Sequence, residues 1–284
     1  MAADTVTLAG HRTVRARVGG GLLTTLTWVV AVGFFFPVLW MVLTAFKQEA
    51  DAYTDPPKIF FTPTLDQFRG VFESGFWPYV GNSAFATVVS TLLVVALALP
   101  AAYALAIKPV KRTQDVLFFF ISTKMLPVVA VIVPLYVAVK NLGLLDNVWS
   151  LVVLYTAMNL PIAVWMLRSF LQEVPKEILE AAQVDGAALP KMLREVLLPI
   201  IMPGVAATAL ICVIFAWNEF FFAVNLTAAR AATVPVFLVG FITSEGLYWA
   251  QLSAAALLST LPVIIAGWIA QNQLVRGLTM GAVK

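Results

Sequence analysis

Long apolar segments, almost without charged residues, constrain the fold of this chain more than any other feature. Roughly 20 apolar helical residues, each rising about 1.5 Å, cross about 30 Å of hydrocarbon. Candidate spans lie at about residues 21–45, 82–107, 115–139, 148–168, 203–225 and 251–275. A membrane barrel would instead show alternating segments of about 10 residues, and none is visible. The sequence therefore predicts an all-α membrane protein with six transmembrane helices.

The composition supports this class and argues against a soluble-type enzyme. Hydrophobic residues make up 61% of the 284 residues and charged residues only 12%, which is unlike a soluble domain. The single cysteine, Cys212, excludes an intrachain disulfide, and the single histidine, His11, lies in the N-terminal tail. With so few ionisable groups we predict no catalytic residue, no metal site and no nucleic-acid partner.

The distribution of lysine and arginine predicts the orientation. With the N-terminus in the cytoplasm, twelve of these residues fall on the cytoplasmic side and five outside, while Lys124 lies within a span. The cytoplasmic set is Arg12, Arg15, Arg17, Lys108, Lys111, Arg112, Arg168, Lys176, Lys191, Arg194, Arg276 and Lys284; the outer set is Lys47, Lys58, Arg69, Lys140 and Arg230. By the positive-inside rule both termini are expected in the cytoplasm.

A polar insert between the fourth and fifth spans is predicted to form a compact pair of short helices on the cytoplasmic side. Pro175 suits a helix start, and Gly186 suits a left-handed helix end, so one helix is expected over about 175–185. Ile178, Ala181 and Ala182 would form its narrow apolar face, and Pro190 would start the second helix. Such short helices need a surface to rest on, either a partner protein or the lipid and the chain's own helix ends.

This insert resembles the EAA loop of permease subunits in bacterial binding-protein-dependent ABC importers. The resemblance rests on Glu180-Ala181-Ala182, Asp185-Gly186-Ala187, Leu198-Pro199 and Pro203-Gly204. Further segments resemble the carbohydrate branch, on the MalG-like side: Asn82-Ser83, 101–106, Trp217-Asn218-Glu219-Phe220, 274–279 and 281–284. The likeness covers roughly 79–284 and implies the type I ABC importer permease fold.

The resemblance implies a mechanism and a set of partners. In this family the loop docks into a cytoplasmic ATPase, so that closure of two ATPase copies rocks the membrane helices. It assigns ATPase coupling to Glu180, Ala181, Ala182, Asp185, Gly186, Ala187 and Pro199. A second homologous permease, an extracytoplasmic solute-binding protein and a small carbohydrate complete the expected system. No Gly-x-x-x-x-Gly-Lys-Ser/Thr motif occurs in the chain, so ATP and Mg are expected to act on the ATPase, with no cofactor bound here.

Five residues are candidates for the substrate pathway. Lys124 lies about nine residues into the third span, next to Met125-Leu126-Pro127, where a lysine costs roughly 2.5–3.5 kcal/mol unless it faces water or a carboxylate. A lysine at this depth is as consistent with pairing to a partner helix as with contact to a substrate. Trp217, Asn218 and Glu219 combine an aromatic ring with polar groups, which suits a sugar but also an interfacial belt. Asn159 completes this set.

The expected organisation has four parts in a multi-pass protein of the bacterial cytoplasmic membrane. They are a cytoplasmic tail at 1–20, a first span with a long, ordered extracytoplasmic loop at 21–78, a transmembrane core at 79–275 with the coupling loop at about 170–202, and a cytoplasmic tail at 276–284. The C-terminal tail either reaches the ATPases or is a disordered end, and the loop at about 226–250 corresponds in position to the family's binding-protein contact.

The leading function is ATP-driven import of a sugar or sugar alcohol, with 122–127 most similar to polyol permeases. The alternatives are an ion-coupled secondary transporter without an ATPase and, less favoured, a membrane-embedded enzyme.

Overall fold

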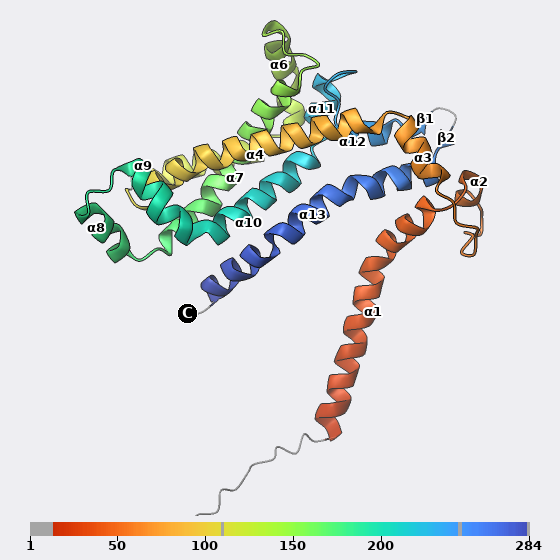
Figure 1. Cartoon of the computed structure of the whole chain (residues 1–284), viewed down its shortest axis with the longest axis horizontal. Coiled ribbons are helices and arrows are strands. Elements are labelled where there is room, and N and C mark those ends of the chain that lie inside the picture. The colour runs from red at the N-terminus through yellow and green to blue at the C-terminus, as the bar shows by residue number, and fades with distance from the viewer. Residues whose placement is uncertain (1–13, 109–110, 244–245, 283–284) are drawn as a thin grey trace, which may run out of the picture.

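The computed structural model describes residues 14–108, 111–243 and 246–282. Among them, five helices are long and apolar enough to cross a membrane, or six if one sharply bent pair is counted as a single span. Helices α4 (Phe76–Ala106), α7 (Val148–Gln172), α10 (Leu198–Trp217) and α13 (Trp249–Ala282) run side by side, whereas α1 (Val14–Ala45) leans away from them (Figure 1). The predicted all-α membrane class is confirmed, with five or six candidate spans. Parts of the two predicted tails, residues 1–13 and 283–284, lie outside the described residues.

The long helices mostly match the predicted spans. They are α1 (Val14–Ala45), α4 (Phe76–Ala106), α7 (Val148–Gln172), α10 (Leu198–Trp217) and α13 (Trp249–Ala282). Small buried residues such as Ala98, Ala102 and Ala163 let α4 and α7 approach closely along their lengths. Helix α13 continues well past the predicted end at 275, so most of the predicted tail extends the last helix.

Two predicted spans are not single helices. The third consists of α5 (Thr113–Met125) and α6 (Val128–Asn141), which meet at an angle of 91°. Leu126 is extended there (ψ 124°), because the ring of Pro127 disfavours helical geometry in the preceding residue. The fifth ends at Trp217, and a separate helix, α11 (Phe221–Leu226), follows. The prediction of a continuous helix over 203–225 is therefore wrong, whereas the third span breaks at the Met125-Leu126-Pro127 segment that its proline marks.

One end of the bundle is closed by short elements from two loops, the long loop after α1, which is ordered as predicted, and the loop at about 226–250. These are α2 (Glu49–Ala52), α3 (Asp66–Glu73), α12 (Val234–Val239) and the antiparallel strands β1 (Ile242–Thr243) and β2 (Gly246–Leu247), in which Ile242 pairs with Leu247. The Glu49 carboxylate accepts the backbone N–H groups of Ala250 and Gln251 at 3.1 and 3.2 Å. These two bonds cap α13, where unpaired N–H groups favour an anion.

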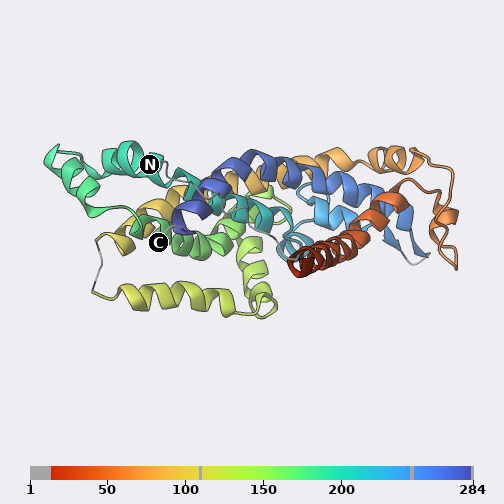
Figure 2. The same ribbon diagram turned by 90° about the horizontal axis from the view of Figure 1, so that it is seen from below.

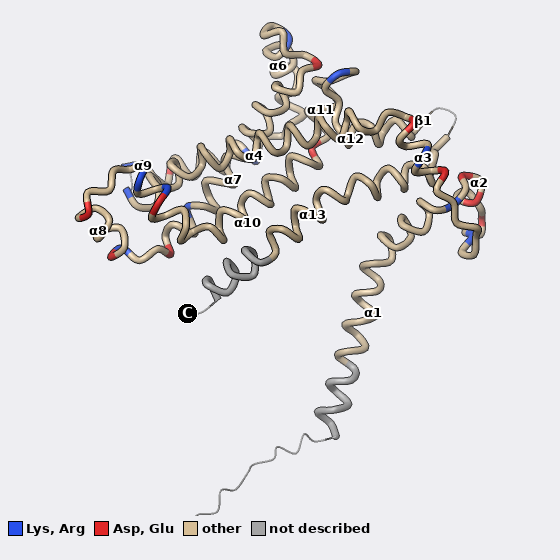
Figure 3. The backbone as a smooth tube through the Cα atoms, viewed as in Figure 1, with Lys and Arg blue, Asp and Glu red and all other residues tan. Residues whose placement is uncertain are grey.

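Helices at the opposite end of the bundle form the polar insert. They are α8 (Lys176–Val184), α9 (Leu189–Lys191) and the π-helix η1 (Met192–Leu197), which leads directly into α10. The view from below shows α8 beyond the ends of the long helices (Figure 2). Most charges of the described residues lie near the two ends of the bundle, and its middle is largely apolar (Figure 3).

Candidate functional site

The end of α8 has the geometry that the sequence predicts. Gly186 has φ 73°, in the left-handed region that glycine adopts readily. Its N–H donates to the Gln183 carbonyl at 3.0 Å, and the N–H of Ala187 donates to the Ala182 carbonyl at 3.0 Å. These bonds close the helix end and turn the chain toward α9, whose first turn contains Pro190.

The buried face of α8 differs from the predicted one. Leu179 and Ala182 are buried in the same core cluster as Leu105 and Leu171, at the ends of α4 and α7. Ile178 and Ala181, predicted to share the apolar face with Ala182, are exposed instead. Leu179 and Ala182 are spaced three residues apart, so the larger leucine side chain determines which stripe of the helix packs on the bundle.

The opposite face of α8 is exposed in the part of the chain that the structure describes. Glu177, Ala181 and Val184 follow helical spacing on that face, and all three are exposed, Val184 at 88%. Of the predicted coupling residues, Glu180, Asp185, Gly186 and Pro199 are exposed as well, Ala187 is partly buried and Ala182 is buried. The sequence interpretation missed Val184, which is a large apolar side chain pointing away from its own protein.

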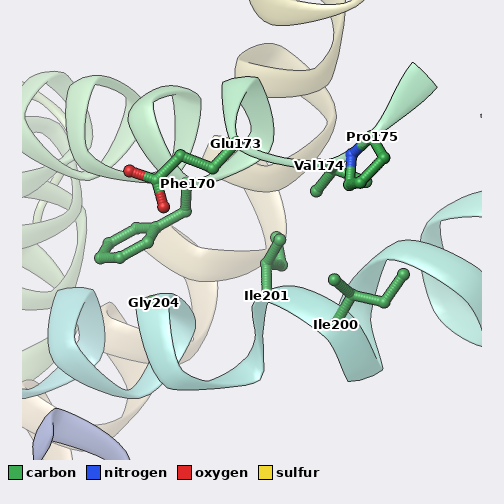
Figure 4. A pocket seen from close by; sticks show the side chains of 7 residues that line it. All are labelled: Phe170, Glu173, Val174, Pro175, Ile200, Ile201 and Gly204. Atoms are coloured by element: carbon green, nitrogen blue, oxygen red, sulfur yellow. The ribbon is translucent and has the colours of Figure 1, made fainter. Parts of the chain in front are cut away.

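A cavity of about 320 Å³ lies where α7 ends and α10 begins. Its lining residues are Phe170, Glu173, Val174, Pro175, Ile200, Ile201 and Gly204 (Figure 4). Gly204 faces the Phe170 ring, and a Cβ atom added to this glycine would lie 2.3 Å from Phe170 Cγ. This contact joins the two membrane helices that lead into and out of the insert.

The predicted pathway residues mostly form contacts within their own bundle. The Trp217 indole N–H donates to the Ser259 carbonyl at 3.1 Å, and Asn159 Nδ2 donates to the Cys212 carbonyl at 3.5 Å. Asn218 Nδ2 donates to the Ile214 carbonyl one turn earlier, at 2.8 Å. Trp217 and Asn218 also line a largely apolar cavity of about 600 Å³ between α1, α10, α12 and α13.

Glu219 has a clear structural role. Its carboxylate accepts the backbone N–H groups of Phe222 and Ala223 at 2.8 and 3.3 Å, which caps α11. Its carbonyl accepts a long bond of 3.5 Å from the Tyr155 hydroxyl. The cap explains why the chain starts a new helix here instead of continuing α10.

Lys124 lies beside α10. Its Nζ atom is 5.8 Å from the centre of the Phe215 ring on α10, and the side chain is exposed beside the break after Met125. Lys124 and Asn159 therefore contact the same stretch of α10, at Phe215 and Cys212. Among the described residues, no group of His, Cys, Asp and Glu side chains could hold a metal ion.

A polar clasp between the loop after α6 and the loop after α11 was missed by the sequence interpretation. The Asp146 carboxylate accepts the backbone N–H groups of Ala228, Ala229, Arg230 and Ala231 at 2.8–3.2 Å. Burial alone would raise the pKa of Asp146, but these four amides hold it below its usual value. Asn82 Nδ2 donates to the carbonyls of Arg230 and Ala232 at 2.8 and 2.9 Å. Ser83 Oγ accepts the N–H of Val234 at 2.8 Å.

Comparison with known proteins identifies the family. Residues 98–279 match the model of the binding-protein-dependent transport system inner membrane component. The probable ABC transporter permease protein y4oR of Sinorhizobium fredii is 42% identical over 93% of this chain and 95% of its own length. The diacetylchitobiose uptake system permease protein DasC of Streptomyces coelicolor is 34% identical, over 90% of this chain and 94% of its own.

Two further similarities agree with this result. The trehalose/maltose transport system permease protein MalG of Thermococcus litoralis is 32% identical over 90% of this chain and 94% of its own length. A solved chain of a bacterial ABC transporter that imports alginate has the same fold, with a TM-score of 0.76 at 22% identity over 93% of this chain and 99% of that chain. The chain therefore belongs to the family of inner-membrane permease subunits of binding-protein-dependent ABC importers.

Proposed function

We propose that this chain is the transmembrane subunit of an ATP-driven importer of a sugar or sugar alcohol, in which α8 receives the movement of a cytoplasmic ATPase. The complete importer would contain a second homologous permease, two copies of the ATPase and an extracytoplasmic solute-binding protein. ATP and Mg would be used by the ATPase, with no cofactor bound to this chain. The observation that carries the proposal is the outward face of α8 in a chain of this family.

The packing of α8 suits such a role. Its inner face rests on the ends of α4 and α7 through Leu179 and Ala182, and η1 continues into α10 without a break. A force applied to Glu177, Ala181 and Val184 would therefore reach α4 and α7 through side-chain contacts and α10 through the backbone. Ala181 leaves room for close approach of a partner, and Val184 offers an apolar anchor.

The cargo class is proposed from the relatives. Curated relatives include permeases named for diacetylchitobiose, trehalose/maltose and sulfoquinovosyl glycerol. All of these are carbohydrates, and residues 122–127 add the hint of a polyol. Mass spectrometry of the ligand that co-purifies with the cognate binding protein would identify the cargo. An amino acid or a metal ion in that protein would overturn the carbohydrate assignment.

An Ala181→Trp variant tests the coupling role. Ala181 is exposed, so the added ring has space within this chain, but it would block a partner surface. We expect normal membrane insertion, loss of ATPase co-purification and at least about tenfold slower uptake, since a steric block at an interface core costs several kcal/mol. Glu73→Trp, on exposed α3, is the matched control. Normal ATPase binding by Ala181→Trp would contradict the proposal.

The secondary-transport alternative and the orientation are tested separately. Vesicles containing the full set of subunits should accumulate the sugar with internal ATP and not with an ion gradient alone; the reverse would favour a secondary transporter. Reporter fusions at each end should show both termini in the cytoplasm, together with loop 170–202. A reporter active outside at either end would overturn the proposed orientation.

A further inference from the structure

The helical turn η1 contains one residue more than an α-helix would place there. It lies between α9 and α10, at the end of the bundle that carries α8 (Figure 1). Its first and last residues, Met192 and Leu197, are five apart and are both buried in the same core cluster. The buried residues that follow are spaced by three or four positions: Ile201, Val205, Thr208 and Cys212.

A π turn accounts for the wider spacing. In an α-helix, residues five apart would point about 140° away from each other, because each residue turns the helix by about 100°. In a π-helix each carbonyl accepts the N–H five residues later, so one extra residue fits into the turn. The N–H of Leu198 accordingly donates to the Leu193 carbonyl. The extra residue thus brings both Met192 and Leu197 to the core.

Proline explains why the turn is opened here. In a continuous α-helix the Glu195 carbonyl would accept the N–H of residue 199, but Pro199 has no N–H and its ring would clash with that carbonyl. A π turn just before Pro199 avoids both problems, since its carbonyls pair with N–H groups one residue farther along. An alanine at this position would remove both obstacles to the α-helix.

The sequence also allows a second register of the same turn. If η1 formed an α-helix while α10 kept its position, residue 193 instead of residue 192 would lie four positions before Leu197 and face the core. Residue 193 is a leucine, and it already packs, partly buried, against the cluster that buries Met192. Each register therefore offers the core a large apolar side chain, Met192 in one and Leu193 in the other.

A change between these registers would act directly on α8. It would turn the chain before η1 by about 100° and move it by about 1.5 Å relative to α10, because one residue enters or leaves the helical repeat. Helix α8 precedes η1, packs against it, and rests on the bundle through Leu179 and Ala182. A displacement of α8 and the register of η1 are therefore mechanically linked.

We propose that η1 is a two-register joint between α8 and α10, held in the π register by Pro199 and shifted to the α register when the ATPase moves α8. Pro199 is then a positioning residue, which acts through the backbone of this chain. The inference rests on the proposed function, since it requires a force on α8. It adds the part of the coupling loop that changes shape and the residue that selects its starting register.

A Pro199→Ala variant tests the joint in the assembled importer. We expect ATPase co-purification and ATP hydrolysis close to wild type. Uptake should be at least about tenfold slower, because relief of a helix-breaking proline shifts a two-state equilibrium by more than that factor and leaves η1 in the α register throughout. Pro262→Ala, which removes a proline from inside α13, is the matched control. Normal uptake by Pro199→Ala, or loss of ATPase binding, would overturn the inference.

The register itself can be measured in the same complex. Spin labels at Lys191→Cys and Met202→Cys, both exposed, flank η1 on one continuous helical segment, in a chain whose buried Cys212 is replaced by serine. Their separation reports the register and is insensitive to rigid movement of α8. It should change between the nucleotide-free and ATP-bound wild-type importer and stay at the ATP-bound value in Pro199→Ala. A constant separation in the transporting wild type would overturn the switch.

A second substitution distinguishes a shifted register from damaged packing. Leu193→Gln puts a polar side chain where the α register buries a leucine, so alone it should hold η1 in the π register and slow uptake about tenfold. Combined with Pro199→Ala, it should rebalance the two registers and return uptake to within about threefold of wild type, whereas independent losses of packing would add. A double variant slower than both single variants would overturn the two-register joint.

The outcomes also separate this inference from the proposed function. If the wild-type chain retains the ATPase and imports sugar with ATP while Pro199→Ala transports normally, the proposed function stands and the inference is overturned. If the wild-type chain does not retain the ATPase, the proposed function itself fails, and the ATP-dependent change across η1 is lost with it.

Discussion

Gly204 of α10 lies directly against the ring of Phe170 of α7, in a contact that has no room for a side chain. An added Cβ atom would lie 2.3 Å from Cγ and 2.4 Å from Cδ2 of that ring (Figure 4). Both residues line the cavity at the base of the coupling loop. The glycine therefore sets the distance between the two helices that connect the loop to the membrane core.

Gly204→Ala should destabilise the bundle and weaken transport. Overpacking of this kind costs about 1–3 kcal/mol, and the shift falls where α8 is attached to α7 and α10. We expect a lower melting temperature in detergent and slower uptake, with partial recovery when Phe170→Leu is added. Gly267→Ala in α13 is the control, because nothing lies within 4 Å of its added Cβ atom. Wild-type stability of Gly204→Ala would refute the tight contact.

The clasp should be insensitive to mild acid. The folded-state pKa of Asp146 is below its unfolded value, so its stabilising contribution is fully present above about pH 3.9 and is lost only as the pH falls through the folded value. A cysteine introduced at Ala229 should therefore react with a thiol reagent to the same extent in proteins incubated at pH 7.5 and at pH 5.5. Greater labelling after the acid incubation would show that the carboxylate titrates higher than its amide partners imply.

Substitutions of Gly186 should change the stability of this chain through the backbone conformation that they impose more than through their side-chain volume. Its φ is 73°, and nothing in the described structure lies within 4 Å of an added Cβ atom. Gly186→Asn should retain most stability because asparagine tolerates this conformation, whereas Gly186→Val should lose about 1–2 kcal/mol. Both can be compared by thermal unfolding of the detergent-solubilised chain. If the added volume alone abolishes ATPase binding in Gly186→Asn at normal stability, the partner approaches this glycine closely.

Several features were predictable because they depend on local chemistry. The length of the apolar segments predicts the spans. Pro175 and Gly186 predict the limits of α8, and Pro127 marks the break in the third span. The direction of that break was not predictable, since a proline ends a helix without specifying where the next one points.

The contacts that define the sites depend on tertiary packing. Which of Ala181 and Ala182 faces the bundle depends on Leu179 and its neighbours on α4 and α7. The clasp joins Asp146 to a turn about 82 residues away, and no local pattern announces it. Asn82 and Ser83 were noticed only as part of a family resemblance, although their side chains hold that same turn.

Glu219 gives the sharpest test of the predicted pathway residues, because a helix-capping role and a sugar-binding role predict different effects of its substitution on stability and on KM. Its carboxylate accepts two backbone N–H groups of α11, so Glu219→Asp should weaken the cap and Glu219→Ala should cost about 1–2 kcal/mol of stability. A capping role lowers the melting temperature in parallel with uptake and leaves the apparent KM for sugar unchanged. A sugar contact instead raises KM at unchanged stability. Measuring both quantities in Glu219→Gln, which keeps one acceptor oxygen for the cap, decides between them: a raised KM with a normal melting temperature would return Glu219 to the substrate pathway.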